Sequence, residues 1–176
     1  DLAAPAARAT LWFADANLTE AMLVRLADTL GPRRLIANAV SEAKARRLRP
    51  VLGGLDCLML NRGEAAALTG RDAPTAAEDL ADALAETGLK GFVLTAGAED
   101  VHVLEDGTLH RFTPRQARVA DVTGAGDALV AGVIAARARG HTLLEAVPFG
   151  LAAAALTLGA TGARAEALSW DALTGI

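Results

Sequence analysis

The stretch Asp121–Asp127, which reads Asp-Val-Thr-Gly-Ala-Gly-Asp, constrains this chain more than any other part of its sequence. It leads directly into residues 128–136, an apolar, alanine-rich run with helical spacing. The glycines therefore lie at a predicted helix N-terminus, where the first backbone N–H groups have no partner within the helix. Such a turn is typical of a binding site for an anion, such as a phosphate group.

Asp127 places a carboxylate where the N–H groups and the helix dipole already favour negative charge. It would repel a phosphate bound there, so its presence needs a reason, and removal of a proton from an attacking hydroxyl is one. The alternative is an Asp that only stabilises the first helical turn, by about 0.3–1 kcal/mol. Two glycines at a helix start are costly unless the backbone must approach a ligand closely, which favours a site.

Length and composition restrict the class of protein. With 176 residues and 52% hydrophobic content, the chain is predicted to form a single globular domain over residues 1–176. A net charge of −4 gives no electrostatic footprint for nucleic acid. We expect no membrane partner and a cytoplasmic location, because neither a long apolar run nor a signal peptide is present. The lone cysteine, Cys57, excludes an internal disulfide and is expected to be buried in a strand.

Short apolar runs alternate with segments of helical spacing along the chain. Strands are predicted at residues 11–14, 34–37, 56–60 and 91–95, followed by a hairpin of residues 101–104 and 109–112 around Asp106-Gly107. Helices are predicted at residues 19–30, 41–52, 61–70, 74–87, 125–139 and 143–158, with a lead-in at 1–9 and a terminal segment at 167–173. Gly31-Pro32 ends the first helix, and the second, capped by Ser41, must bend or end near Pro50. The alternation implies an α/β fold with a largely parallel sheet and helices on both faces.

In such a sheet the ligand site lies beyond the carboxyl ends of the strands. Polar residues stand at or just after the ends of the apolar runs: Asn17, Asn38, Asn61 and Thr95. Asn61 and Glu64 share one face of the following helix and suit a hydrated Mg²⁺ bound to phosphates, or else a capping box that needs no ligand. Thr95-Ala96-Gly97 suits a phosphate or a ribose, or an ordinary transition from strand to turn.

Other patterns exclude or weaken alternative sites. The chain has no Gly-x-x-x-x-Gly-Lys-Ser/Thr loop, so a Walker-type site is excluded. A dinucleotide turn at Gly124-x-Gly126 lacks its third glycine, since Leu129 stands there. The three histidines have no spacing that joins them and are expected at the surface or in a pocket wall. The following basic cluster is interpreted as a solvated helix face: Lys44, Arg46, Arg47 and Arg49.

Together these residues resemble the PfkB-type carbohydrate kinase family, which has the ribokinase-like fold. Residues 121–132 are similar to the family's C-terminal signature, Asp-Thr-Thr-Gly-Ala-Gly-Asp with a glycine five residues on. Asn61-Arg62-Gly63-Glu64 resembles its Asn-x-x-Glu motif, and Thr95-Ala96-Gly97 its Thr-x-Gly segment. The resemblance covers nearly the whole chain and implies the C-terminal, nucleotide-binding and catalytic part of the fold, incomplete on its N-terminal side.

The resemblance also implies roles for the matching residues. Asp127 would be the general base that deprotonates a hydroxyl of the acceptor. The backbone N–H groups of Gly124, Ala125 and Gly126 would form an anion hole for the transferred γ-phosphoryl group. Thr95 and Gly97 would contact the nucleotide, ATP.

Metal ions follow from the same resemblance. Asn61 and Glu64 would organise Mg²⁺ through its water molecules. K⁺ would bind beside the signature loop, at the following positions: Asp121, Thr123, Leu158, Thr161 and Gly162.

Three positions depart from the family pattern. Val122 stands in the signature where the family has threonine, and Asp100 stands in place of a second glycine. Leu151 stands where a polar residue often reaches the adenine, which leaves apolar contact alone.

Within the family, Asp15–Leu18 and Ala39–Ala45 look most like the pseudouridine kinases, while ribokinase, fructokinase and other nucleoside kinases stay open. The implied function is ATP-dependent phosphorylation of a sugar or nucleoside hydroxyl. The alternative is a nucleotide-binding fragment or regulator, inactive without the N-terminal sugar-binding and lid part. A sheet edge and apolar surface left uncovered would favour association, so a homo-oligomer is also open.

Overall fold

The computed structural model describes residues 8–31, 33–72, 74–114, 117, 119–162 and 165–175. The chain divides into two compact units, Asp1–Phe112 and Thr113–Ile176, and each is described by itself. Residues 1–7 of the expected lead-in and Pro32 of the expected helix stop lie outside the described residues. The single domain over residues 1–176 stays a prediction.

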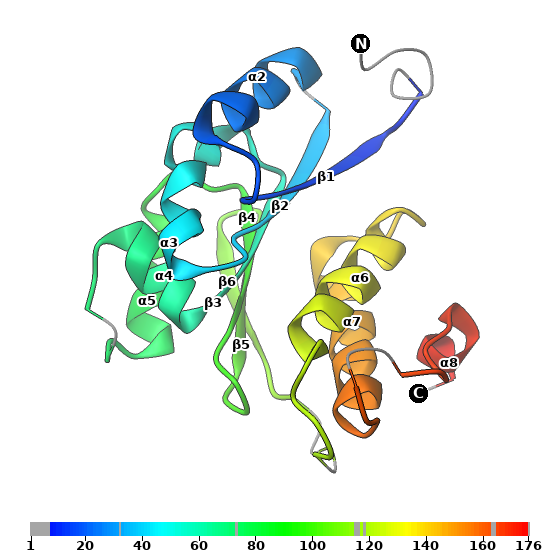
Figure 1. The fold of residues 1–176 in the computed structure, drawn as a ribbon. Helices are drawn as coiled ribbons and strands as arrows, with labels where there is room; N and C mark the ends of the chain where they lie inside the picture. Colours follow the sequence, from blue (N-terminus) through cyan, green and yellow to red (C-terminus); the bar gives the residue numbers. More distant parts are fainter. Residues whose placement is uncertain are drawn as a thin grey trace. The chain divides into compact units, whose positions relative to one another are not determined.

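The first unit is built on a six-stranded sheet in which spatial order follows chain order (Figure 1). Its strands are β1 (Leu11–Asp15), β2 (Arg34–Asn38), β3 (Cys57–Asn61), β4 (Gly91–Thr95), β5 (Val101–Glu105) and β6 (Thr108–Phe112). The first four strands are parallel, and β5 and β6 add antiparallel. The predicted fold class, α/β with a largely parallel sheet, is confirmed.

The hairpin of β5 and β6 forms at the predicted turn. Asp106 and Gly107 have φ values of 50° and 74°. Positive φ at both central positions is what a type I′ turn requires, and this turn matches the twist of the flanking strands. The Asp-Gly pair therefore determines the register of the last two strands.

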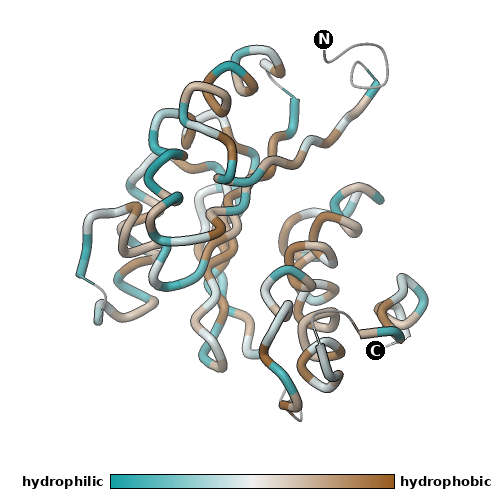
Figure 2. The backbone as a smooth tube through the Cα atoms, in the orientation of Figure 1, coloured by the Kyte–Doolittle hydropathy of each residue, from teal (hydrophilic) through white to brown (hydrophobic). Residues whose placement is uncertain are grey.

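Helices of the first unit pack on one face of the sheet (Figure 1). They are α2 (Glu20–Leu30), α3 (Glu42–Ala45), α4 (Arg62–Thr69) and α5 (Ala77–Ala85), with the 3₁₀ helix η1 (Arg46–Gly54). Alternate strand residues point into the core beneath them, among them Leu35, Leu58, Leu60, Phe92 and Leu94. In Figure 2 the central strands are mostly brown, whereas teal and brown alternate along these helices, as expected for half-buried elements. Helices over the second face stay a prediction.

The segment after β2 differs from the expected helix over residues 41–52. The α-helix lasts only one turn, to Ala45, and the chain continues as 3₁₀ helix to Gly54. Pro50 explains the change, because it has no N–H to donate and its ring clashes with the carbonyl four residues before it in an α-helix. Ser41 stands at the N-cap, but its hydroxyl makes no capping hydrogen bond.

The second unit consists of the helices α6 (Ala125–Arg137), α7 (Leu143–Leu158) and α8 (Trp170–Thr174). Two glycines allow α6 and α7 to approach closely. A Cβ added to Gly132 would lie 2.7 Å from the carbonyl oxygen of Phe149, and one added to Gly150 would lie 2.8 Å from that of Leu129. Neither site has room for a methyl group, so this contact requires glycine on both helices.

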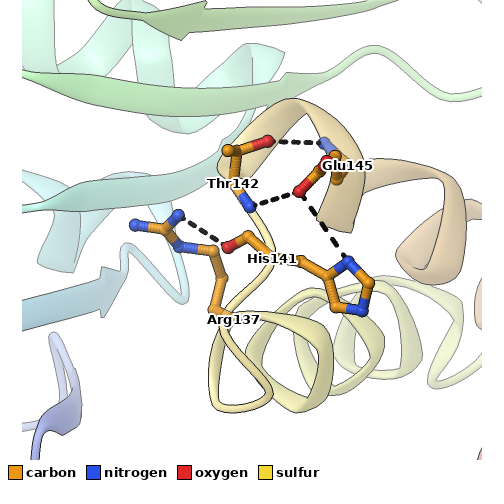
Figure 3. A network of polar contacts seen from close by, with 4 residues as sticks. All are labelled: Arg137, His141, Thr142 and Glu145. Carbon is orange, nitrogen blue, oxygen red and sulfur yellow. Dashed lines mark hydrogen bonds and ion pairs between the residues drawn. The ribbon is translucent and has the colours of Figure 1, made fainter.

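Polar contacts stabilise the turn between α6 and α7 (Figure 3). Thr142 and Glu145 form a capping box, in which the Glu145 amide donates to Thr142 Oγ1 at 3.2 Å and the Thr142 amide donates to Glu145 Oε2 at 2.9 Å. Arg137 donates to the carbonyl of His141 at 3.0 Å. The hydrogen bonds from Thr142 lower the pKa of the Glu145 carboxyl, which therefore stays ionised.

Candidate active site

The predicted site residues lie on both units. The first unit carries Asn61, Glu64, Thr95 and Gly97. The second unit carries Asp121, Thr123, Gly124, Ala125, Gly126, Asp127, Leu151, Leu158, Thr161 and Gly162.

Asn61 and Glu64 form a reciprocal capping box at the start of α4. The backbone N–H of Glu64 donates to Asn61 Oδ1 at 3.0 Å, and the backbone N–H of Asn61 donates to Glu64 Oε2 at 2.9 Å. The capping interpretation is therefore confirmed as the local geometry. It fixes both side chains at the carboxyl end of β3, which is where a site is expected in an α/β sheet.

The Glu64 carboxyl is nearly removed from solvent, with 5% of the residue exposed. Burial raises its pKa, and the hydrogen bond from the Asn61 amide opposes this effect. The negative charge of Glu42 raises the pKa further. Glu42 lies close by, because a Cβ added to Gly63 would clash with its Oε1. A cation would offset the charges of both carboxylates.

These residues fit Mg²⁺ bound through water better than Mg²⁺ bound directly. The capping box occupies Asn61 Oδ1 and Glu64 Oε2, which leaves Oε1 of Glu64 to accept from a metal-bound water. Mg²⁺ keeps several of its waters in most protein sites, so one carboxylate oxygen suffices for this mode. Among the described residues, no group of three or more His, Cys, Asp and Glu side chains could hold a metal ion.

The structure brings Thr95 beside Asn61. The two residues are register partners at the ends of β4 and β3, and the Thr95 hydroxyl lies 3.5 Å from the carbonyl oxygen of Leu60. Gly97 follows in an exposed turn with a φ of 69°, which favours glycine. An ion pair between Arg62 and Glu99 joins this turn to the Asn-x-x-Glu segment. The two motifs therefore form one edge of the sheet.

In the second unit the signature loop turns into α6 at Gly124. Gly124 is the N-cap and has a φ of 81°. Within the described part of the chain, the N–H groups of Gly124 and Gly126 have no hydrogen-bond acceptor. The Ala125 N–H makes a long contact of 3.4 Å with the carbonyl of Val122. The turn thus offers two free N–H donors to an anion, and a third that is only weakly engaged.

Asp127 lies in the first turn of α6 and is exposed. Its carboxylate makes no hydrogen bond or ion pair with any residue that the structure describes. By contrast, Glu64 and Glu145 each cap their own helix with the side chain. The Asp127 side chain does no such capping, so the structure leaves it available to a ligand.

Asp121 ties the signature loop to the loop after α7. Its Oδ1 accepts from the Thr123 amide at 2.9 Å, and its Oδ2 accepts from the Gly162 amide at 3.2 Å. The hydrogen bonds from Thr123, and then that from Gly162, lower the pKa of Asp121 and keep it ionised. An ionised carboxylate fits the expected K⁺ site.

The carbonyl positions proposed for K⁺ differ in availability. The Leu158 carbonyl already accepts from the amides of Ala120 at 2.7 Å and Asp121 at 3.3 Å. The carbonyls of Thr123, Thr161 and Gly162 stay predicted ligands. Leu151, which is predicted to contact the adenine, lies on α7 and is half-buried. It stands seven residues before Leu158, which is about two helical turns.

The basic cluster is solvated as interpreted, since Arg46 and Arg49 are exposed and Lys44 and Arg47 are half-buried, but its side chains also make specific contacts. Lys44 and Arg47 bond to the loop after β1, while Arg46 and Arg49 donate to the carbonyls of Ala67 and Leu68 at the end of α4. Unpaired carbonyls at a helix C-terminus attract such cations, and this is the signal that could have predicted the second pair of contacts.

The prediction for His102 was wrong. It was expected at the surface or in a pocket wall, but it is buried on β5 with 7% of its surface exposed. It stands within a short run of otherwise apolar residues, Val101–Leu104, all of which are buried, and such a run is consistent with a fully buried strand. No helix among the described residues is long and apolar enough to cross a bilayer.

The comparison with known families agrees with this geometry. The model of the pfkB family of carbohydrate kinases matches residues 8–170. The chain therefore belongs to the pfkB carbohydrate kinase family. Asn61-Arg62-Gly63-Glu64 and the signature loop both fall within the matched segment.

Particular relatives extend the comparison. Pseudouridine kinase of Escherichia coli strain K12 is 31% identical over 155 residues, which are 86% of this chain and 49% of that protein. A solved carbohydrate kinase from Agrobacterium tumefaciens is 37% identical with a TM-score of 0.81, over 96% of this chain and 54% of its own. Ribokinase from Thermotoga maritima, 22% identical, has the same fold, with a TM-score of 0.81 over 95% of this chain and 56% of its own. The chain spans about half the length of these relatives.

Proposed function

We propose that the protein containing this chain transfers the γ-phosphoryl group of ATP to a hydroxyl of a sugar or nucleoside, and that its acceptor is pseudouridine. The observation that carries the proposal is the start of α6. There the Asp127 carboxylate follows a turn with the N–H groups of Gly124 and Gly126, and none of these groups has a partner among the described residues. Membership in the pfkB family supports the reaction class, and the Escherichia coli relative supports the acceptor.

The chemistry assigned to the chain's own residues is as follows. Asp127 accepts the proton of the acceptor hydroxyl as the hydroxyl oxygen attacks the γ-phosphorus, while the bond from that phosphorus to the oxygen shared with the β-phosphate breaks and ADP leaves. The N–H groups of residues 124–126 stabilise the charge on the transferred phosphoryl oxygens. Thr95 and Gly97 contact the nucleotide, and Leu151 contributes apolar contact with the adenine.

The proposed metal ions are held by separate groups of residues. Glu64, oriented by Asn61, orders the waters of Mg²⁺, which neutralises phosphate charge when it is bound. Asp121, with the carbonyls of Thr123, Leu158, Thr161 and Gly162, would hold K⁺ beside the loop. Use of ATP also supports action in the cytoplasm.

Replacement of Asp127 tests the proposal. In the full-length protein, Asp127→Asn is expected to abolish phosphorylation of pseudouridine while ATP still binds, because only the proton acceptor is lost. Turnover is measured by product formation and ATP binding by calorimetry.

Asp171→Asn is the matched control, since Asp171 is also an exposed acidic residue in a first helical turn, that of α8. If Asp127 only stabilised its helix, both variants would lose about 0.3–1 kcal/mol of stability and keep their activity. That result would refute the base assignment. ATP binding by the wild type without phosphorylation of pseudouridine, ribose, fructose or adenosine would instead favour the nucleotide-binding alternative.

A further inference from the structure

The loop that follows β1 is held by two cations from the segment after β2. Lys44 Nζ donates to Asn17 Oδ1 at 2.6 Å. Arg47 Nη1 donates to the carbonyl of Ala16 at 3.0 Å and lies 3.4 Å from those of Asn17 and Leu18. The backbone N–H of Asn17 donates to Asp15 Oδ1 at 2.9 Å. The loop is therefore fixed in one conformation.

The contact with Lys44 determines which way the Asn17 side chain faces. An ammonium group has donors and no acceptor, so it must meet the oxygen of the amide and not its nitrogen. The usual ambiguity between the oxygen and nitrogen of an asparagine is removed. Nδ2 then points away from Lys44, and among the described residues it has no hydrogen-bond partner.

Asn17 is exposed and lies at the carboxyl edge of the sheet. Asp15, two residues earlier, is paired in register with Asn38 at the end of β2, and the Ala16 amide donates to the Asn38 carbonyl at 2.9 Å. In an α/β sheet this edge is where ligands bind. The two N–H donors of Asn17 Nδ2 are held at this edge by the hydrogen bond from Lys44, so they are pre-organised to bind an oxygen atom.

We infer that Asn17, held by Lys44, binds the acceptor substrate by donating hydrogen bonds from Nδ2 to one of its oxygens, a hydroxyl or a ring carbonyl. The inference rests on the proposed kinase function and assigns part of its acceptor site. Asn17 is the binding residue, and Lys44 is a positioning residue that acts through it. The Lys44 charge also polarises the amide and strengthens its N–H donors.

Asn17→Asp is the decisive variant, because a carboxylate keeps the partner of Lys44 but has no N–H to donate. In the full-length protein we expect the KM for pseudouridine to rise roughly tenfold, the effect of losing one or two hydrogen bonds. The kcat and the KM for ATP should stay within about twofold of the wild type. The melting temperature should not fall, since the loop keeps its contact.

Lys44→Met removes the donor while keeping the length of the side chain, and it should raise the KM for pseudouridine in the same direction. Lys44→Arg, which again donates to Asn17 Oδ1, should restore it. Arg46→Ala is the matched control, because Arg46 is a cation of the same segment that bonds to Ala67 on α4 and not to the loop. It should leave both KM values unchanged.

Unchanged KM for pseudouridine in Asn17→Asp would overturn the inference, as would equal changes in the KM for ATP. The proposed function is judged separately, by equilibrium binding of pseudouridine and of ribose to the wild type and to Asn17→Asp. If the wild type binds either probe more tightly than the variant but phosphorylates none, the kinase proposal fails and the assignment of Asn17 stands. If the wild type binds neither, the assignment of Asn17 is refuted.

Discussion

His102 lies inside the first unit, and its surroundings determine the direction of its pKa. Burial is the largest cause and lowers the pKa below the ordinary value for histidine, because it disfavours the charged imidazolium. The charge of Arg111, its register partner on β6, lowers it further. Glu78, Asp100 and Asp82 act in the opposite direction, but they are weaker causes. The folded protein therefore favours a neutral His102.

This residue should make stability depend on pH. The unfolded chain takes up a proton as the pH falls through about 6.5, while the folded chain resists protonation until a lower pH. The stability that the fold gains from a neutral His102 is fully present above about pH 6.5 and is lost as the pH falls toward the pKa of His102 in the folded protein. In His102→Gln, the difference in the free energy of unfolding between about pH 7.5 and about pH 5.5 should shrink, as measured by urea unfolding.

A second buried variant on the same strand separates titration from packing. Val103 is fully buried and has no titratable group, so Val103→Ala should lower stability equally at both pH values. An unchanged pH dependence in His102→Gln would contradict the assignment of the effect to this imidazole.

At the scale of elements, the contact between α6 and α7 depends on the absence of side chains. The glycine five residues after Asp127 belongs to the signature that the sequence displays, but its role follows only from the structure. Gly132 faces the backbone of Phe149 and Gly150, and Gly150 faces that of Leu129. Backbone atoms cannot rotate away as a side chain can, so the helices would have to move apart to admit a methyl group.

Gly132→Ala should therefore destabilise the second unit, although alanine is the better helix former by about 1 kcal/mol. Overpacking of this kind costs typically about 1–3 kcal/mol, and a clash with backbone belongs at the upper end. Chemical unfolding of the variant measures the loss. Gly53→Ala is the control, since a Cβ at Gly53 meets nothing within 4 Å. Equal stability of the two variants would show that the close approach of α6 and α7 is not required.

The bounds of most helices and strands follow from local patterns. Thr19 caps α2, accepting from the Met22 amide, and Gly70 ends α4 in a left-handed conformation, as the sequence predicts. The α-helix expected from Ser41 to Leu52 fails because Pro50 acts on the turn before it. Helix α5 begins at Ala77 and not at Pro74, since termini are the least determined part of a periodic pattern.

The candidate site was predictable only where its contacts are local. The pairing of Asn61 with Glu64 spans three residues, and helix geometry brings such residues together. The bond from Lys44 to Asn17 spans 27 residues and depends on how two loops meet at the sheet edge. No helical or strand periodicity in the sequence predicts a contact between residues so far apart in the chain. The N–H groups near Gly124 were predictable in part. The sequence predicts the turn that presents them, but it does not predict the long contact between the Ala125 N–H and the Val122 carbonyl.

At the scale of the whole molecule, protection from solvent is uneven across the sheet. Every residue of Cys57–Leu60 in β3 and of Gly91–Leu94 in β4 is buried, whereas none of the residues of β6 is fully buried. Amides in the central strands should exchange hydrogen with solvent only on global unfolding, and those of β6 through local opening.

Hydrogen exchange followed by mass spectrometry tests this gradient. Peptides covering β3 and β4 should exchange slowest, and denaturant at low concentration should accelerate β6 first. The turn at Asp106-Gly107 is a useful point of comparison, because its residues are exposed. Exchange of β6 at the rate of β3 would contradict the gradient and indicate that the sheet opens as one unit.

Because each strand of the sheet lies beside the strand that precedes it in the chain, the first unit suits assembly during translation. As the chain leaves the ribosome, every new strand finds a neighbour that has already emerged, and no strand waits for a partner from far downstream. Chains emerge at about 5–20 residues per second, so the stretch from β1 to β4 emerges over roughly 4–17 s and can assemble strand by strand during that time. Growth in this order covers the open edge of each new strand when the next strand emerges, which limits the interval in which that edge can pair with another nascent chain.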